Sequence, residues 1–200
     1  MTLAKKYLAD LTSGGLFLPE SRVVAELMLA SDSEAEWLAR VTRSNALQKR
    51  SGQTALRYAR TIRRRLEPLG QAYIEELVGA HDGLYKQLLM LSAALHTPAL
   101  ADFMADVVKE SKRIYRPDIN ANAWEQFMDS KYRHIEGLDR LSPGTIHKSG
   151  VSVIRILVEA GYLSDNRQRL LQPVYLLPET KRWLIELQRE ELEPVMECTL

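Results

Sequence analysis

The chain has 200 residues, of which 46% are hydrophobic and 26% charged, and its formal net charge is +1. This composition is typical of a globular protein with one large domain or two small ones, and it excludes a largely disordered chain. The single cysteine, Cys198, excludes an intrachain disulfide and fits a reducing compartment.

No secretory leader is apparent, because Lys5 and Lys6 are followed by a mixed segment rather than an apolar one. The most apolar run, Leu88–Leu95, is much shorter than the stretch of about 20 residues that a membrane-spanning helix needs. We therefore expect a cytoplasmic protein without a membrane partner.

Three helices are predicted before residue 70. The first follows Pro19 and repeats its apolar residues at helical spacing. The second, 33–43, has Ser33 at its N-cap, and the third, 51–66, has Ser51 at its N-cap. The third helix is expected to end before Pro68.

Positive charge is concentrated in the window 37–66, which holds nine Lys or Arg and no Asp or Glu. On a helical wheel, the helix 51–66 has two opposite faces, each within an arc of about 60°. The core face consists of Ala55, Ala59, Ile62 and Leu66. The outward face, which we call the arginine stripe, consists of Gln53, Arg57, Arg60 and Arg64. Arg63 and Arg65 flank the core face, and their stems are expected to turn outward.

The arginine stripe indicates contact with nucleic acid. Neighbouring arginines repel one another, so a partner must offset the repulsion. Guanidinium groups suit phosphates and guanine edges, and the amide of Gln53 suits adenine. The short helix 33–43 before a basic helix is similar to a helix-turn-helix, although the connection 44–50 exceeds the usual tight turn. The DNA contacts predicted in this region are Arg40, Arg43, Lys49, Arg50, Gln53, Arg57, Arg60 and Arg64.

The rest of the chain is also predicted to be helical. The expected helices lie near 73–79, 84–95, 100–116, 122–131, 142–160 and 178–187. The helix 84–95 is apolar nearly all round and is expected to be central to the core. The run 170–177 is expected to be extended, at most a short β-hairpin or wing. The fold class is therefore all-α, a compact multi-helix globular fold with helix-turn-helix-like elements.

A second helix-turn-helix-like element is predicted at about 122–163. Its last helix opens at Ser142 and carries Lys148 and Arg155, which complete the set of predicted DNA contacts. Residues 1–200 are thus expected to form a single compact helical protein. It would have an N-terminal helix-turn-helix-like subdomain at about 1–70 and a central and C-terminal subdomain at about 71–200.

Nothing in the sequence indicates catalysis, a metal or a cofactor. The phosphate-binding glycine loops and the nucleophile elbow of hydrolases are both missing from the sequence. The histidines are too far apart to have the spacing of zinc ligands; they are His81, His96, His134 and His147. We therefore expect a protein that is not an enzyme and binds no cofactor.

Three blocks of sequence resemble one protein family. They are LTSGGLFLPESRVVAELML (Leu11–Leu29), LQKRSGQTALRYARTIRRRL (Leu47–Leu66), and RILVEAGYL followed by LQPVYLLPE (within Arg155–Glu179). Together, in this order and at this chain length, they are similar to BrxA, the small core protein of BREX (bacteriophage exclusion) systems of bacteria. The resemblance implies an all-helical cytoplasmic protein that binds DNA in phage defence, with no established catalytic residues to carry over.

The predicted function is therefore non-enzymatic binding of double-stranded DNA in phage defence, possible together with binding to other BREX proteins. One alternative is RNA binding, which arginine-rich helical domains also perform. Another is an adaptor whose basic face docks on an acidic partner. No long heptad seam is present, so a monomer is expected.

Overall fold

The structure is a computed structural model that describes residues 2–43 and 45–198. The predicted all-α fold is confirmed: these residues form helices and, apart from isolated β-bridges, no sheet. In chain order the α-helices are α1 Leu3–Leu8, α2 Leu18–Leu29, α3 Glu34–Arg43, α4 Gly52–Leu66, α5 Gln71–Gly79, α6 Asp82–His96, α7 Pro98–Phe103, α8 Glu110–Arg113, α9 Ala123–Lys131, α10 Pro143–Glu159, α11 Pro178–Glu186 and α12 Glu193–Met196. Short 3-10 turns lie at Leu11–Ser13 (η1), Glu67–Leu69 (η2) and Glu190–Leu192 (η4).

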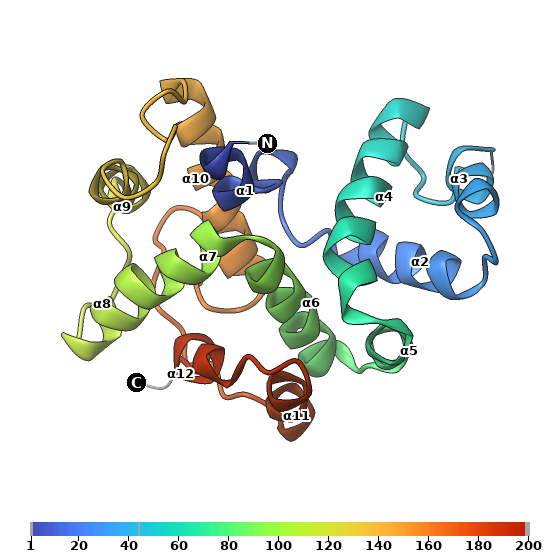
Figure 1. Cartoon of the computed structure of the whole chain (residues 1–200). Coiled ribbons are helices and arrows are strands. Elements are labelled where there is room, and N and C mark those ends of the chain that lie inside the picture. Colours follow the sequence, from blue (N-terminus) through green and yellow to red (C-terminus); the bar gives the residue numbers. More distant parts are fainter. Residues whose placement is uncertain (1, 44, 199–200) are drawn as a thin grey trace.

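Helix α6 occupies the centre of the molecule. It packs against α4 and α5 on one side and against α7 and α11 on the other. Figure 1 shows α2 to α5 gathered to the right of α6, with α1 and α7 to α10 to its left. The prediction of a core helix at 84–95 is confirmed, because nearly every residue of α6 from Leu84 to Ala94 is buried.

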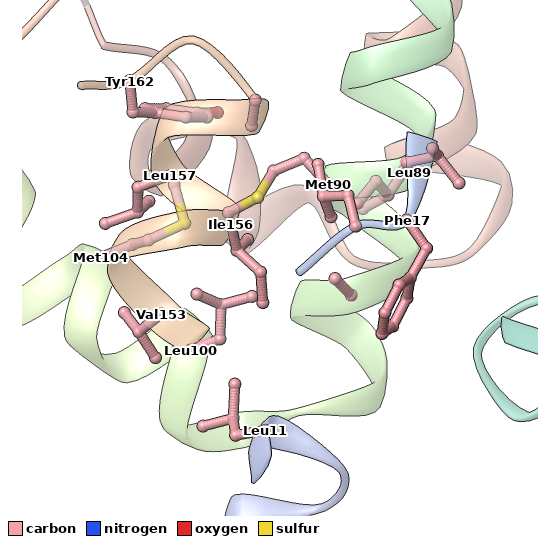
Figure 2. Close-up of a cluster of buried hydrophobic side chains, with 14 of the residues drawn as sticks. Leu11, Phe17, Leu89, Met90, Leu100, Met104, Val153, Ile156, Leu157 and Tyr162 are labelled. Carbon is pink, nitrogen blue, oxygen red and sulfur yellow. The ribbon is translucent and has the colours of Figure 1, made fainter. Parts of the chain in front are cut away.

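The two sides share one hydrophobic core. Figure 2 shows side chains from η1, α6, α7 and α10 meeting in it, together with Phe17 from the segment before α2. The labelled members are Leu11, Phe17, Leu89, Met90, Leu100, Met104, Val153, Ile156, Leu157 and Tyr162. Their burial joins segments from both ends of the chain, which is the main source of stability for such a fold.

The predicted helix starts differ in how they are capped. The Ser33 hydroxyl accepts a hydrogen bond from the Glu36 N–H at 3.2 Å, and the Ser142 hydroxyl accepts one from the Thr145 N–H at 3.2 Å. Ser51 occupies the N-cap position of α4 as predicted, but its side chain makes no capping hydrogen bond. The α4 N-terminus is thus defined by the backbone, through the Ala55 N–H donated to the Ser51 carbonyl.

The helix predicted over 100–116 is present but is not α-helical throughout. Its middle, Met104–Lys109 (η3), is π-helical and joins α7 to α8. Within the described residues no single helix is long and apolar enough to cross a membrane. Only a pair bent by 110°, Asp82–His96 with Pro98–Arg113, satisfies the length and composition requirement jointly.

The run 170–177 is extended, as predicted, but it does not pair with itself. Leu170, Leu171 and Val174 form isolated antiparallel bridges with three different segments, at Asp118, Leu163 and Cys198. Leu171, Val174 and Leu176 are buried, which ties this run to the body of the protein.

Candidate nucleic-acid interface

The two faces predicted for α4 are present. All members of its core face are at most 1% exposed, because α4 packs against α2, α3 and α6. All members of the arginine stripe are exposed. The exposed cations therefore follow from helical periodicity: residues three and four apart share a face, and burying one face presents the other to solvent.

Little acidic charge balances the arginine stripe. Within the described residues, Arg57, Arg60 and Arg64 take part in no ion pair. Arg57 lies over the neighbouring Tyr58 ring, 5.3 Å from its centroid, and Arg64 donates to the Thr61 hydroxyl at 3.4 Å. These guanidinium groups are consequently available for an anionic partner.

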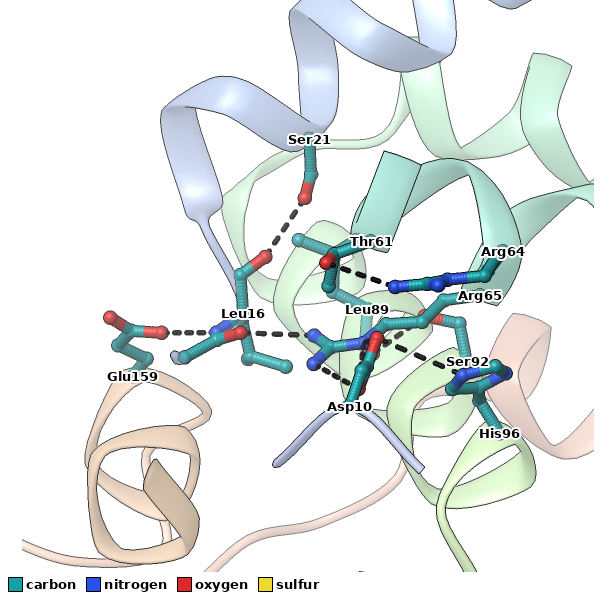
Figure 3. Close-up of polar contacts among 11 residues, drawn as sticks. Asp10, Leu16, Ser21, Thr61, Arg64, Arg65, Leu89, Ser92, His96 and Glu159 are labelled. Carbon is teal, nitrogen blue, oxygen red and sulfur yellow. Dashed lines mark hydrogen bonds and ion pairs between the residues drawn. The ribbon is translucent and has the colours of Figure 1, made fainter. Parts of the chain in front are cut away.

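The outward orientation expected for Arg65 is wrong. Arg65 is 5% exposed, and its guanidinium donates to the Asp10 carboxylate and to the Gly15 carbonyl oxygen, both at 2.9 Å (Figure 3). A buried charge requires a partner, and Asp10 supplies it across 55 positions of sequence. Arg65 therefore attaches α4 to the segment 10–17 rather than extending the basic surface.

His96 lies against the same ion pair, with its Nε2 3.7 Å from an Asp10 carboxylate oxygen. Burial lowers the pKa of His96, Asp10 raises it, and Arg65 and Arg64 lower it. The net direction is downward because burial, the largest contribution, outweighs the attraction of Asp10. Burial thus disfavours the protonated form of His96 beside the pair.

The predicted contacts before α4 are mixed in their surroundings. Arg43 and Arg50 are exposed. Arg40 is exposed and pairs with Glu36 at 2.6 Å. Lys49 is partly buried and pairs with Glu20. Arg63, which flanks the core face, pairs with Glu67 at 2.7 Å and lies over the Trp37 ring at 4.8 Å.

Helix α10 presents a second basic face. Lys148 and Arg155 are seven residues apart, share a side of the helix and are both exposed. The opposite side of α10 packs on α9, where Gly150 leaves room for the Trp124 indole. Arg155 donates to Glu159 at 2.7 Å. The structure thus places both predicted α10 residues at the surface.

Chemistry other than charge is sparse. The described part of the chain has no group of three or more His, Cys, Asp or Glu side chains that could hold a metal ion. A hollow of about 500 Å³ lies between the ends of α2, α3, α4 and α5, and its lining includes Trp37, Arg63 and Glu67. Arg63 and Glu67 pair with each other there.

Comparison with known proteins decides the family. The sequence model of the BrxA family matches residues 5–188. The chain belongs to the BrxA family. Two relatives, each named "BREX protein BrxA", support this. The one from Escherichia coli O9:H4 strain HS is 37% identical over 193 residues, covering 96% of this chain and 91% of the relative. The one from Paramagnetospirillum magneticum strain AMB-1 is 32% identical over 181 residues, covering 90% and 91%.

Membership of the BrxA family confirms the resemblance of the three sequence blocks, and it makes the chain a component of BREX phage defence. The fold is shared with a solved structure, described as that of an uncharacterized protein from Magnetospirillum magneticum. The two superpose with a TM-score of 0.86 at 28% identity, over 97% of this chain and 100% of the other. The BrxA fold described above is therefore found in a crystal structure as well.

Sequence reasoning missed the acidic partners within this BrxA site. Asp10 and Glu20 were not predicted to contact Arg65 and Lys49, because both acids lie in segments distant from the basic window. Glu159 was missed although its i,i+4 spacing from Arg155 favours their ion pair. One signal was available: Arg65 flanks the core face on the wheel, and the window 37–66 holds no acid, so its partner had to come from elsewhere.

Proposed function

We propose that the protein is a non-enzymatic, cytoplasmic component of BREX that binds double-stranded DNA through α4, with contributions from α3, the connection 44–50 and α10. The arginine stripe carries this proposal: its three arginines are exposed, and none of them pairs with an acid in the described residues. Phosphates of a duplex would offset their mutual repulsion, and guanidinium forks suit such contacts.

Duplex DNA is favoured over single-stranded nucleic acid by the surroundings of Tyr58. Sequence-specific recognition of single strands relies on aromatic rings that are free to stack on bases. Tyr58 is the aromatic residue next to the arginine stripe, and its ring packs against Phe17 with centroids 4.5 Å apart. Because the Tyr58 ring is engaged with Phe17, the basic surface would recognise its partner mainly through charge.

A salt titration of duplex binding tests the proposal. Gel shifts with duplexes of unrelated sequence should give an affinity that falls with salt, with a slope of about −0.9 per phosphate neutralised. The variant Arg57→Ala/Arg60→Ala/Arg64→Ala should weaken binding and reduce the slope by about 2.7, three times the single-phosphate value. A charge-matched variant, Arg113→Ala/Arg116→Ala/Arg182→Ala, alters exposed arginines outside both predicted helix-turn-helix-like elements and should bind like the wild type.

Full affinity in the arginine-stripe variant would show that α4 is not the contact surface. Stronger binding to a structured RNA than to duplex DNA at the same salt would favour the RNA alternative. Partners that co-purify after complete nuclease digestion, and that are lost only in the arginine-stripe variant, would favour the adaptor.

A further inference from the structure

Two cations lie beside the ring of Tyr58. Its half-buried ring lies beside Lys49, whose Nζ is 5.1 Å from the ring centroid, and beside Arg57, whose guanidinium carbon is 5.3 Å away. Lys49 comes from the connection before α4, and Arg57 belongs to the arginine stripe. The ring thus lies between the connection before α4 and the arginine stripe.

Glu159 of helix α10 binds the backbone close to the ring of Tyr58. The Leu16 N–H donates to one Glu159 carboxylate oxygen at 2.5 Å, and Arg155, one turn earlier on α10, donates to the other at 2.7 Å. Leu16 directly precedes Phe17, the residue that packs on Tyr58. The side of α10 that carries Arg155 therefore lies next to the start of α2 and the ring of Tyr58.

The electrostatics of Arg155 agree with this placement. The hydrogen bond to Glu159 raises the pKa of Arg155, burial lowers it, and the negative charge of Glu20 makes a smaller upward contribution. Glu20 also pairs with Lys49. Arg155 therefore lies within range of the charge of Glu20, the acid that pairs with Lys49.

The charge around Tyr58 is positive in sum. Three cations, Lys49, Arg57 and Arg155, lie with two acids, Glu20 and Glu159. Glu20 pairs with Lys49, and Glu159 pairs with Arg155. Arg57, which belongs to the arginine stripe, pairs with neither acid. Among these three cations, Arg57 alone takes part in no ion pair within the described residues.

The segment 10–17 holds α4 and α10 together at this junction. From the α4 side, Arg65 binds Asp10 and the Gly15 carbonyl oxygen. From the α10 side, Glu159 accepts from the Leu16 N–H, as Figure 3 shows. Because both helices bind neighbouring groups of one buried segment, their basic faces are fixed relative to each other before any partner arrives.

We propose that α4 and α10 contact one and the same DNA duplex, which lies across the junction at Tyr58 with its phosphates at Arg57, Lys49 and Arg155. This inference rests on the proposed function and adds to it that the two helices form a single interface. Phosphate contacts of Lys49 and Arg155 would then be made in competition with Glu20 and Glu159, which now hold these cations.

The test compares Arg155→Ala with Arg113→Ala. Both arginines are exposed and pair with an acid of their own helix, Glu159 or Glu110. We expect Arg155→Ala to weaken duplex binding roughly three- to tenfold and to reduce the salt slope by about 0.9, whereas Arg113→Ala should do neither. Arg155→Lys keeps the charge and should keep the wild-type slope. Thermal melting of each variant verifies that it is folded.

A complementary variant removes the competing acid. Glu159→Gln retains an oxygen that can accept from the Leu16 N–H and should bind a duplex roughly two- to fivefold more tightly, because less negative charge faces the phosphates. Glu110→Gln is its control on α8 and should have no effect. The binding ratio should be one duplex of about two helical turns per chain.

The single-interface inference is overturned if Arg57→Ala weakens binding while Arg155→Ala and Glu159→Gln leave affinity and slope unchanged, or if two duplexes bind per chain. In that case the proposed function stands. If Arg57→Ala and the arginine-stripe variant also bind like the wild type, the proposed function itself fails, and the inference fails with it. Effects of Arg155→Ala on a structured RNA alone would likewise overturn it.

Discussion

At the scale of single residues, the arginines of α4 have two distinct surroundings. Those of the arginine stripe face solvent, whereas the side chains of Arg65 and Asp10 are each only 4% exposed and 2.9 Å apart. Exposed charges contribute little to stability, because water and salt screen them. A buried pair behaves differently, since removal of one partner leaves the other charge without water or a counterion.

The variant Arg65→Met tests this difference. Methionine fills a similar space but cannot pair with Asp10, so we expect the free energy of unfolding in urea to fall by about 3–5 kcal/mol. The double variant Arg65→Met/Asp10→Leu removes both charges and should recover part of this loss. Arg113→Met, on the surface, should unfold like the wild type. Equal stability of Arg65→Met and the wild type would contradict the structural role of the pair.

At the scale of elements, α9 and α10 pack closely at one glycine. A Cβ added to Gly150 would lie 2.5 Å from the Trp124 ring, whose indole N–H donates to the Ile146 carbonyl oxygen at 2.9 Å. Trp124 also packs against Phe103 and Phe127, both with ring centroids 5.4 Å away. The ring therefore has little freedom to move away from α10.

Replacement of Gly150 by alanine should consequently reverse the usual effect of this substitution. In most helix interiors Gly→Ala stabilises by about 1 kcal/mol, through helix propensity. Here we expect Gly150→Ala to destabilise by about 1–3 kcal/mol through overpacking. Gly144→Ala in the same helix meets only the Ser142 hydroxyl, at 3.9 Å, and should be neutral or stabilising. Thermal unfolding measures the change in stability of the two variants. A stabilised Gly150→Ala would contradict the close packing of α9 on α10.

The elements of the site could be predicted as far as they depend on local spacing. The bounds of α4 and its two faces follow from the order of residues along one helix, so the exposure of Arg57, Arg60 and Arg64 was accessible from sequence. Arg65 was misplaced because its environment is set by Asp10, which the wheel of one helix does not contain. The π-helical turn of Met104–Lys109 was missed for a similar reason: its residues have ordinary helical periodicity.

At the scale of the whole molecule, α6 connects two groups of helices through one core. Sequence predicted this helix as central from its apolar composition, but it did not predict which helices surround it. Those neighbours are determined by contacts between distant segments, such as Tyr73 donating to the Leu88 carbonyl oxygen and Tyr162 donating to that of Met196. Nothing in a local pattern encodes such pairings.

The shared core predicts that both groups unfold together. Hydrogen exchange measured by mass spectrometry in rising urea should give the same transition midpoint for peptides from α2 to α5 and from α7 to α10, because loss of either group exposes α6. Peptides from Asp82–His96 should change at that midpoint as well. An earlier transition confined to α2–α5 would show that this group is an independent unit.

The contact between Gly15 and Glu159 has a consequence for how relatives of this chain diverge. A Cβ at position 15 would lie 2.3 Å from a Glu159 oxygen, so a larger residue there displaces the Glu159 carboxylate from its present position. Mutation at either position is therefore constrained by the other. A displaced carboxylate, like a shorter residue 159, gives up the bonds to the Leu16 N–H and to Arg155. We therefore expect residues 15 and 159 to covary among relatives, although 143 residues lie between them along the chain.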